Sequence, residues 1–174
     1  MMKSKQTLLV IIIRGPPASG KSTTGKRLRN KLDQKTAHIQ VDFLKRMISK
    51  EITKESRDMS HESAQILTDV FLKKGWNVVI EELFIYNEYI GGVVKIAEGL
   101  GCKVFIFELT APLEVLIQRD ASKNYGVIGG IKWLRKLYKL ISENPEPRAI
   151  KIDTSKNSID ETVNIILTEI NNKL

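Results

Sequence analysis

The stretch Leu8-Leu9-Val10-Ile11-Ile12-Ile13, followed after one residue by Gly15-Pro16-Pro17-Ala18-Ser19-Gly20-Lys21-Ser22, decides the fold of this chain. A continuous apolar run is typical of a central parallel strand that is buried on both faces. The segment 21–32 carries helix-forming residues, with Leu28 and Leu32 four apart. Strand, loop and helix in this order form the context in which the spacing G-x-x-x-x-G-K-S binds phosphate, so we prefer this interpretation to an ordinary glycine-rich turn.

The loop predicts which atoms hold a nucleoside triphosphate. Its backbone N–H groups surround an anionic pocket, Lys21 lies over the β- and γ-phosphates, and the Ser22 hydroxyl binds Mg²⁺. We therefore expect ATP and Mg²⁺ as cofactors. The predicted nucleotide contacts in this segment are Gly15, Pro16, Pro17, Ala18, Ser19, Gly20, Lys21, Ser22 and Thr23.

The composition limits the remaining possibilities. A chain of 174 residues with 42% hydrophobic residues can bury one core, and no Pro/Gly/Ser-rich stretch divides it, so we expect a single domain over residues 1–174. The single Cys102 cannot form an internal disulfide, which favours a cytoplasmic location. The first apolar run is too short for a signal peptide or a membrane span. The net charge of +8 suits a nucleic-acid partner and equally an enzyme that gathers polyanionic nucleotides.

Strand and helix patterns alternate along the chain. Further strands are predicted over 37–41, 78–80, 104–107 and 149–152, and helical apolar patterns occupy 64–71, 90–97 and 159–170. This alternation predicts a three-layer α/β/α sandwich with a five-stranded parallel sheet. In such sheets the ligand binds at the carboxyl ends of the strands.

Acidic residues follow two of the predicted strands. Asp42 comes directly after the second strand, where its carboxylate can accept the proton of an attacking hydroxyl or hold a Mg²⁺-bound water. The alternative is an N-cap for a helix that starts near Phe43. Glu81 and Glu82 end the third strand, and only one of them can face the site because neighbouring strand residues point to opposite sides. We choose Glu81 as the residue near Mg²⁺; the alternative is an acid exposed to solvent.

Basic residues mark two more segments. Arg46 and Arg57 are candidates for holding an acidic or phosphorylated acceptor, although arginines are more often surface charges. The segment 131–141 places Lys132, Arg135, Lys136 and Lys139 on one helical face and Ile131, Leu134, Tyr138 and Ile141 on another. The basic face fits a lid over the triphosphate, a polyanion-binding surface or a solvated helix face. Gly126, Gly129 and Gly130 lie just before the segment 131–141. They would serve as the hinge of a lid that is formed by about residues 122–147.

Later motifs resemble a known family. The segment Pro112-Leu113-Glu114-Val115, then Arg119-Asp120, and the pieces Asn144-Pro145-Glu146 and Asp153-Thr154 are similar to segments of adenylylsulfate kinase. The chain thus looks like the small P-loop kinases of metabolites, a group that includes gluconate kinase, chloramphenicol phosphotransferase and the zeta-type toxin kinases. The resemblance implies a P-loop nucleoside triphosphate hydrolase fold, similar to that of nucleoside monophosphate kinases, with a small lid.

The resemblance also implies site residues. In such kinases the arginine at the position of Arg119 packs on the adenine or reaches the phosphates, and the loop matching Thr154, Ser155 and Lys156 borders the base, which favours ATP over GTP. The zeta-type and antibiotic-kinase relatives place a lone Asp, the general base, where Asp42 stands. Two substrate-side segments depart from adenylylsulfate kinase: Gln40-Val41-Asp42 replaces Asp-Gly-Asp, and Glu82-Leu83-Phe84-Ile85 replaces a Ser-Pro segment. The identity of the acceptor therefore stays open.

These observations predict transfer of the γ-phosphoryl group of ATP to a hydroxyl of a small-molecule acceptor. Lys21, Asp42 and Arg119 are the predicted catalytic residues, and Ser22, Asp42 and Glu81 are the predicted metal residues. Asp42, Arg46 and Arg57 are the predicted acceptor contacts. A 5′-hydroxyl nucleic-acid kinase and a nucleotide-dependent switch are the alternatives, and the sequence leaves both a monomer and a homodimer open.

Overall fold

A five-stranded parallel sheet forms the centre of the protein, which we describe from a computed structural model over residues 7–32, 35–122 and 130–174. The strand order is β2-β3-β1-β4-β5, and every neighbouring pair is parallel. The strands are β1 (Leu9–Arg14), β2 (Thr36–Gln40), β3 (Asn77–Glu81), β4 (Lys103–Thr110) and β5 (Ile150–Asp153). The helices are α1 (Lys21–Lys31), α2 (Val41–Ile48), α3 (Lys54–Lys73), α4 (Asn87–Gly99), α5 (Leu113–Ala121), α6 (Gly130–Glu143) and α7 (Ile159–Asn171).

Two apolar layers cover the two faces of the sheet. Alternate residues of β1 divide between them: Val10 and Ile12 pack with residues of α2, α3 and α4, whereas Leu9, Ile11 and Ile13 pack with residues of α1 and α7. The central strand is buried throughout, which explains its continuous apolar run. The predicted three-layer α/β/α sandwich with five parallel strands is confirmed.

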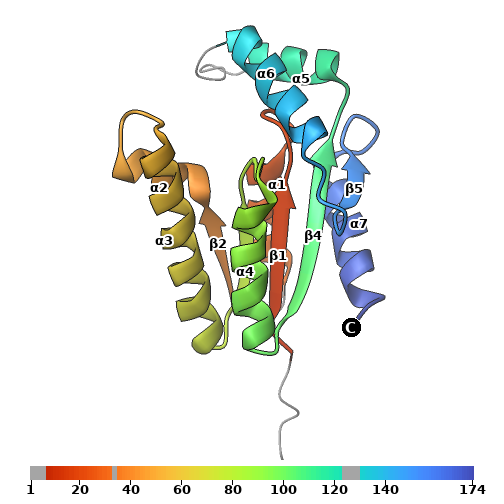
Figure 1. Ribbon diagram of the computed structural model, residues 1–174. Helices are drawn as coiled ribbons and strands as arrows, with labels where there is room; N and C mark the ends of the chain where they lie inside the picture. Colours follow the sequence, from red (N-terminus) through yellow and green to blue (C-terminus); the bar gives the residue numbers. More distant parts are fainter. Residues whose placement is uncertain (1–6, 33–34, 123–129) are drawn as a thin grey trace, which may run out of the picture.

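A third apolar cluster joins α5 to α6 at the carboxyl end of the sheet. Leu116 of α5 and Leu134 of α6 are fully buried in it, and Ala18 of the glycine-rich loop packs against it. Figure 1 shows the two helices above the tips of the strand arrows. They therefore lie next to the end of the sheet at which a ligand is expected.

Several boundaries differ from the sequence prediction. The second strand ends at Gln40, and Val41 is already the first residue of α2. The fourth strand was predicted only over its apolar residues, but it continues to Thr110 because Glu108 pairs in register with Arg14 of β1. Within the described ranges, no helix is both long and apolar enough to cross a membrane.

Candidate active site

The glycine-rich loop takes a conformation that requires its glycines. Gly15 has a φ of 143°, and a Cβ atom there would lie 2.3 Å from the carbonyl oxygen of Leu109 on β4. Gly20 has a φ of 93° and precedes the first residue of α1. A side chain at Gly15 would collide with backbone that cannot move aside. The loop is therefore fixed between β1 and α1 by close packing as well as by its own turns.

The start of α1 provides the positive groups of the site. Its first residue, Lys21, is buried, and its Nζ donates a hydrogen bond to the Pro16 carbonyl oxygen at 2.9 Å. No acidic residue lies in the first turn of α1. The backbone N–H groups at the start of the helix, the helix dipole and the Lys21 ammonium thus coincide at one loop, an arrangement suited to an anion.

Glu81, at the end of β3, faces this loop. Its Oε1 accepts hydrogen bonds from the Ser22 hydroxyl at 2.7 Å and from the Gln40 amide at 3.0 Å. Glu81 is buried, so the alternative of a solvent-exposed acid is wrong. Burial raises the pKa of Glu81 above its ordinary value and Asp42 adds to this, while Lys21 and the bonds from Ser22 and Gln40 oppose it. The contact with Gln40 was not predicted.

The Ser22 and Glu81 side chains fit a magnesium ion. Hydroxyl and carboxylate oxygens are the hard ligands that Mg²⁺ prefers, and this ion keeps several waters and binds substrate phosphates instead of needing a full protein cage. In the part of the chain that the structure describes, no group of three or more His, Cys, Asp or Glu residues is arranged to hold a metal. The donor set therefore suits an ion that arrives with a nucleotide.

Asp42 lies in the first turn of α2, which follows β2, the strand next to β3 in the sheet. Gln40 is the N-cap residue of α2, so the N-cap alternative for Asp42 is wrong. The Asp42 side chain is 51% exposed, and its Oδ1 lies 3.1 Å from Nζ of Lys45. Asp42 thus keeps one face of its carboxylate open while a cation holds the other.

Lys45 and Glu82 form a buried ion pair that the sequence analysis did not find. Glu82 follows Glu81 directly and points to the opposite face of the sheet, where it binds Nζ of Lys45 through a short hydrogen bond. Burial by itself lowers the pKa of Lys45, but the charges of Glu82 and Asp42 and their hydrogen bonds outweigh it, so the pKa is raised. Lys45 is therefore a permanent cation beside Asp42. The D-x-x-K spacing on one helix was a signal for the contact between Lys45 and Asp42, but not for the pair with Glu82.

Arg119 joins α5 to the loop after β5. Its guanidinium donates to the Thr154 hydroxyl at 2.9 Å and to the Thr154 carbonyl at 2.6 Å. Ser155 and Lys156 follow in this loop, and both are exposed. Nζ of Lys156 lies 3.6 Å from Oδ2 of Asp153. The structure thus brings together Arg119 and the loop that the family resemblance placed beside the base.

The two arginines predicted to hold the acceptor lie on α2 and α3. Arg46 is exposed, and its Nε donates to the backbone carbonyl of Asp42 at 3.2 Å. Arg57 is half-buried, and its Nε is shielded from solvent without a hydrogen bond. Arg46 is therefore tied to the start of α2.

The predicted basic face is found on α6. Lys132, Arg135, Lys136 and Lys139 are all exposed, and Leu134 and Ile141 are buried as expected. Ile131 is 52% exposed, so its assignment to the apolar face is wrong; Leu137 is buried on that face instead. Of the three proposed hinge glycines, Gly130 has a φ of 66°, and Gly126 and Gly129 lie outside the described residues, as do residues 123–129 of the predicted lid.

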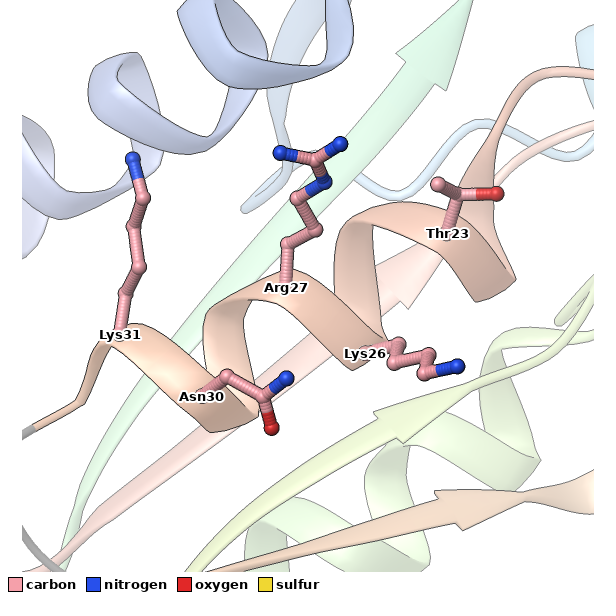
Figure 2. A pocket seen from close by; sticks show the side chains of 5 residues that line it. All are labelled: Thr23, Lys26, Arg27, Asn30 and Lys31. Carbon is pink, nitrogen blue, oxygen red and sulfur yellow. The ribbon is translucent and has the colours of Figure 1, made fainter.

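A surface hollow of about 480 Å³ runs along α1 and is separate from the groups above. Figure 2 shows that Arg27 and Lys31 point toward α7, where they bind Asp160 and Asn164 at 2.7 and 3.1 Å. Thr23, a predicted nucleotide contact, lies at one end of this hollow. Two of the five side chains that line the hollow thus join α1 to α7.

A second buried charge network lies directly before the loop, at Arg14. Its side chain is fully buried; Nε lies 3.2 Å from Oε2 of Glu108, close enough for an ion pair but not aligned for a hydrogen bond. The guanidinium also donates to the Asn144 carbonyl at 2.9 Å and to Oδ1 of Asn87 at 3.4 Å. Arg14 thereby ties the segment after α6 to the strand that carries the loop. In the sequence, the only sign of this network was that a charged residue, Arg14, ends an apolar strand.

The parallel sheet, the phosphate-binding loop at the end of its central strand and the helical pair above it define a P-loop domain. A family model described as an AAA domain, AAA_33, matches residues 10–126. The chain belongs to this family of P-loop domains. Comparison with curated protein sequences gives no match.

Solved structures of kinases share the fold over nearly the whole chain. A sugar kinase from Janibacter sp. HTCC2649 has a TM-score of 0.73 at 19% identity and covers 95% of both chains. The APS kinase CysC of Mycobacterium tuberculosis, in complex with AMPPNP and APS, has a TM-score of 0.71 at 14% identity and covers 95% of this chain and 98% of that one. A gluconokinase from Sinorhizobium meliloti 1021 has a TM-score of 0.68 at 18% identity, covering 89% and 87%. The resemblance to P-loop metabolite kinases is thus confirmed at the level of the fold.

Proposed function

We propose that this protein is an ATP-dependent phosphotransferase that moves the γ-phosphoryl group to a hydroxyl of a small molecule. One observation carries the proposal: the hydroxyl of Ser22, in the phosphate-binding loop, lies 2.7 Å from the buried carboxylate of Glu81. This pair stands beside Lys21, and the half-exposed Asp42 lies on the neighbouring element. The site thus combines groups for the triphosphate with a carboxylate for the acceptor.

Each residue has a role in this proposal. The loop amides and Lys21 neutralise the phosphates, and Ser22, Glu81 and Asp42 would hold Mg²⁺ or its water shell. When bound, the ion neutralises charge on the phosphate oxygens. Arg119 covers the base or the phosphates from α5, supported by its bonds to Thr154. The Thr154, Ser155 and Lys156 loop borders the base.

Asp42 acts on the acceptor. It orients the acceptor hydroxyl and takes its proton as the oxygen attacks the γ-phosphorus. The new P–O bond forms while the bond from the γ-phosphorus to the bridging oxygen breaks, and that oxygen leaves with ADP. The proton passes from Asp42 to solvent. Arg46 and Arg57 lie on the acceptor side in this proposal, where they hold an anionic group of the acceptor.

In this proposal the basic helix α6 is part of a lid that residues 122–147 form. Its packing on α5 and its position above the strand ends support that role, because a cover that excludes water prevents wasteful hydrolysis (Figure 1). We further propose a cytoplasmic protein, in agreement with its single cysteine. The sugar kinase, gluconokinase and APS kinase among the structural neighbours support a hydroxyl-bearing small molecule as acceptor.

The proposal is tested by acceptor-stimulated release of ADP. Purified protein with ATP and Mg²⁺ is combined with pooled sugars, sugar acids, nucleosides and oligonucleotides, and each stimulating pool is divided into single compounds. We expect one class to raise ADP release and to carry the phosphate of γ-labelled ATP. Asp42→Asn should lower this stimulated rate by about 100-fold or more. If no pool stimulates release and Asp42→Asn equals the wild type, the phosphotransferase proposal is wrong.

A nucleic-acid end is the second candidate acceptor, because α6 exposes four basic side chains on one face. Oligonucleotide binding would then weaken steeply with salt, since phosphate contacts release counterions. Binding that does not change between low and high salt contradicts this alternative. A nucleotide-dependent switch, the third candidate, predicts that affinity for a protein partner differs between the ATP and ADP states.

A further inference from the structure

The buried pair of Lys45 and Glu82 has no part in holding the nucleotide, yet it touches the proposed acceptor-side residue. The side chains of Lys45 and Glu82 are only 8% and 4% exposed, whereas that of Asp42 is 51% exposed. Lys45 reaches both carboxylates at once. A half-exposed aspartate is thus held by a cation that is itself fixed inside the protein.

Such a pair is costly to keep for stability alone. Desolvation of two charges offsets much of their attraction, and apolar side chains of similar volume often replace a buried pair without loss. The surroundings would allow that replacement, because Val41 and Leu44 of the same helix are buried in the apolar layer over the sheet. The position of the pair next to Asp42 therefore points to a role in the site.

The backbone around Glu82 fixes the pair in place. The second oxygen of Glu82 accepts a short hydrogen bond from the N–H of Phe84. Phe84 is fully buried and has a φ of 46°, a conformation that a bulky residue adopts only when its surroundings impose it. The bend after β3 thus holds Glu82, Glu82 holds Lys45, and Lys45 holds Asp42.

Glu81, the last residue of β3, and Glu82, which follows it directly, serve the two halves of the site. Glu81 faces the Ser22 hydroxyl, and Glu82 faces Lys45 on the other side of the sheet. Any shift of this strand end would move both contacts together. The distance between the triphosphate side and the acceptor side is therefore set at the end of one strand.

We propose that Lys45, held by Glu82, is a positioning residue for Asp42. Its ammonium fixes Oδ1 of Asp42 and leaves the exposed part of the carboxylate to the acceptor hydroxyl. This inference rests on the proposed function, in which Asp42 acts on the acceptor. It predicts that loss of the ammonium lowers turnover and leaves ATP binding intact.

Replacing Lys45 alone would leave the buried carboxylate of Glu82 without its cation, so the test uses a double variant. Lys45→Met/Glu82→Gln removes both buried charges and keeps an oxygen that can accept the Phe84 N–H. Lys45→Arg keeps the cation, and Lys50→Met removes an exposed lysine as the matched control. The assay follows ADP release from ATP and Mg²⁺ with water as the acceptor, and separates kcat from KM for ATP.

We expect kcat of the double variant to fall about 10- to 100-fold, because a reacting group displaced by about 1 Å costs this much. KM for ATP in the double variant should stay within about twofold of the wild-type value. Lys45→Arg should keep most of the wild-type kcat, as expected if the charge positions Asp42. Lys50→Met should match the wild type. Unchanged kcat in the double variant would overturn the inference. It would also be overturned if Lys45→Arg had the melting temperature of the wild type but a kcat as low as that of the double variant.

A measurement on Asp42 itself separates this inference from the proposed function. Side-chain NMR couplings of Asp42 should report one fixed rotamer in the wild type and in Lys45→Arg, and averaged rotamers in Lys45→Met/Glu82→Gln. Equal couplings in all three proteins contradict positioning by Lys45. Failure of the proposed function has another signature: Asp42→Asn would keep wild-type turnover while the couplings still respond to Lys45.

Discussion

Replacing Arg14 by methionine should strongly destabilise the protein. Arg14 is fully buried at the end of β1, and burial lowers its pKa while Glu108, Glu146 and Glu82 raise it. Burial outweighs the carboxylates, so the pKa of Arg14 is lowered, but a guanidinium titrates far above neutral pH and stays charged inside the protein. Methionine fills part of the same space but supplies neither the charge nor the hydrogen bonds. The substitution thus tests how much the network before the loop contributes to folding.

The structure gives the magnitude of this effect. Without Arg14, the buried Glu108 keeps, among the residues that the structure describes, an ion pair with Lys151, whose Nζ lies 3.6 Å away and which is largely exposed. Removing one partner of a buried ion pair costs about 3–5 kcal/mol. The Asn144 carbonyl also loses its donor at 2.9 Å, which costs about 1 kcal/mol if water does not replace it. Because these contributions overlap, we expect a loss of about 4 kcal/mol in the free energy of unfolding.

The assay is urea denaturation followed by circular dichroism, as a double-mutant cycle. Arg14→Met/Glu108→Leu should be more stable than Arg14→Met by about 2 kcal/mol or more, because no unpaired buried charge is left. Lys151→Met, the control at the exposed end of the network, should change the free energy by less than about 1 kcal/mol. A loss below about 1 kcal/mol in Arg14→Met, or a double variant as unstable as the single one, would refute the reasoning.

Two further predictions concern Arg119 and His61. Arg119→Ala should weaken ATP binding by about 10-fold in calorimetry, because two hydrogen bonds to Thr154 are lost and the cover over the nucleotide loosens; equal affinity would contradict its assignment. His61 is buried and stacks on Tyr89 with ring centroids 3.7 Å apart, and burial lowers its pKa to about 4. The charged groups around it are Glu82, Lys45, Asp42 and Arg57. Because the unfolded state takes up this proton near pH 6.5 and the folded state only near pH 4, stability should fall by up to about 3 kcal/mol as pH drops through this window. His61→Phe should keep the stack and flatten this part of the profile, and an unchanged profile would show that another group causes it.

Periodicity along the chain was sufficient for the fold. The run Leu8–Ile13 predicted the buried central strand, and the alternation of side chains in a strand correctly required Glu81 and Glu82 to face opposite sides. The loop spacing fixed the positions of Lys21 and Ser22. These features depend on residues near one another in the sequence.

The remaining features depend on contacts between distant residues. The pairing of Arg14 with Glu108 joins two strands, and a reading of apolar residues ended the fourth strand before Glu108. The contact between Lys45 and Glu82 joins a helix to the end of a strand, which no local pattern contains. Ile131 was wrongly placed because helical spacing alone does not say which side of α6 meets α5. Polar interactions across the fold are thus what the sequence left unpredicted.

Binding of ATP in the presence and absence of Mg²⁺, measured by isothermal titration calorimetry, tests the central claim most directly. We expect a dissociation constant between about 1 µM and 1 mM with Mg²⁺, in the usual range for enzyme substrates. Lys21→Met should weaken binding by at least about 10-fold, Glu81→Gln should reduce the dependence on Mg²⁺, and the exposed control Lys95→Met should match the wild type. ATP affinity that does not change in Lys21→Met and does not depend on Mg²⁺ would contradict the claim that this loop and the Ser22–Glu81 pair hold the triphosphate.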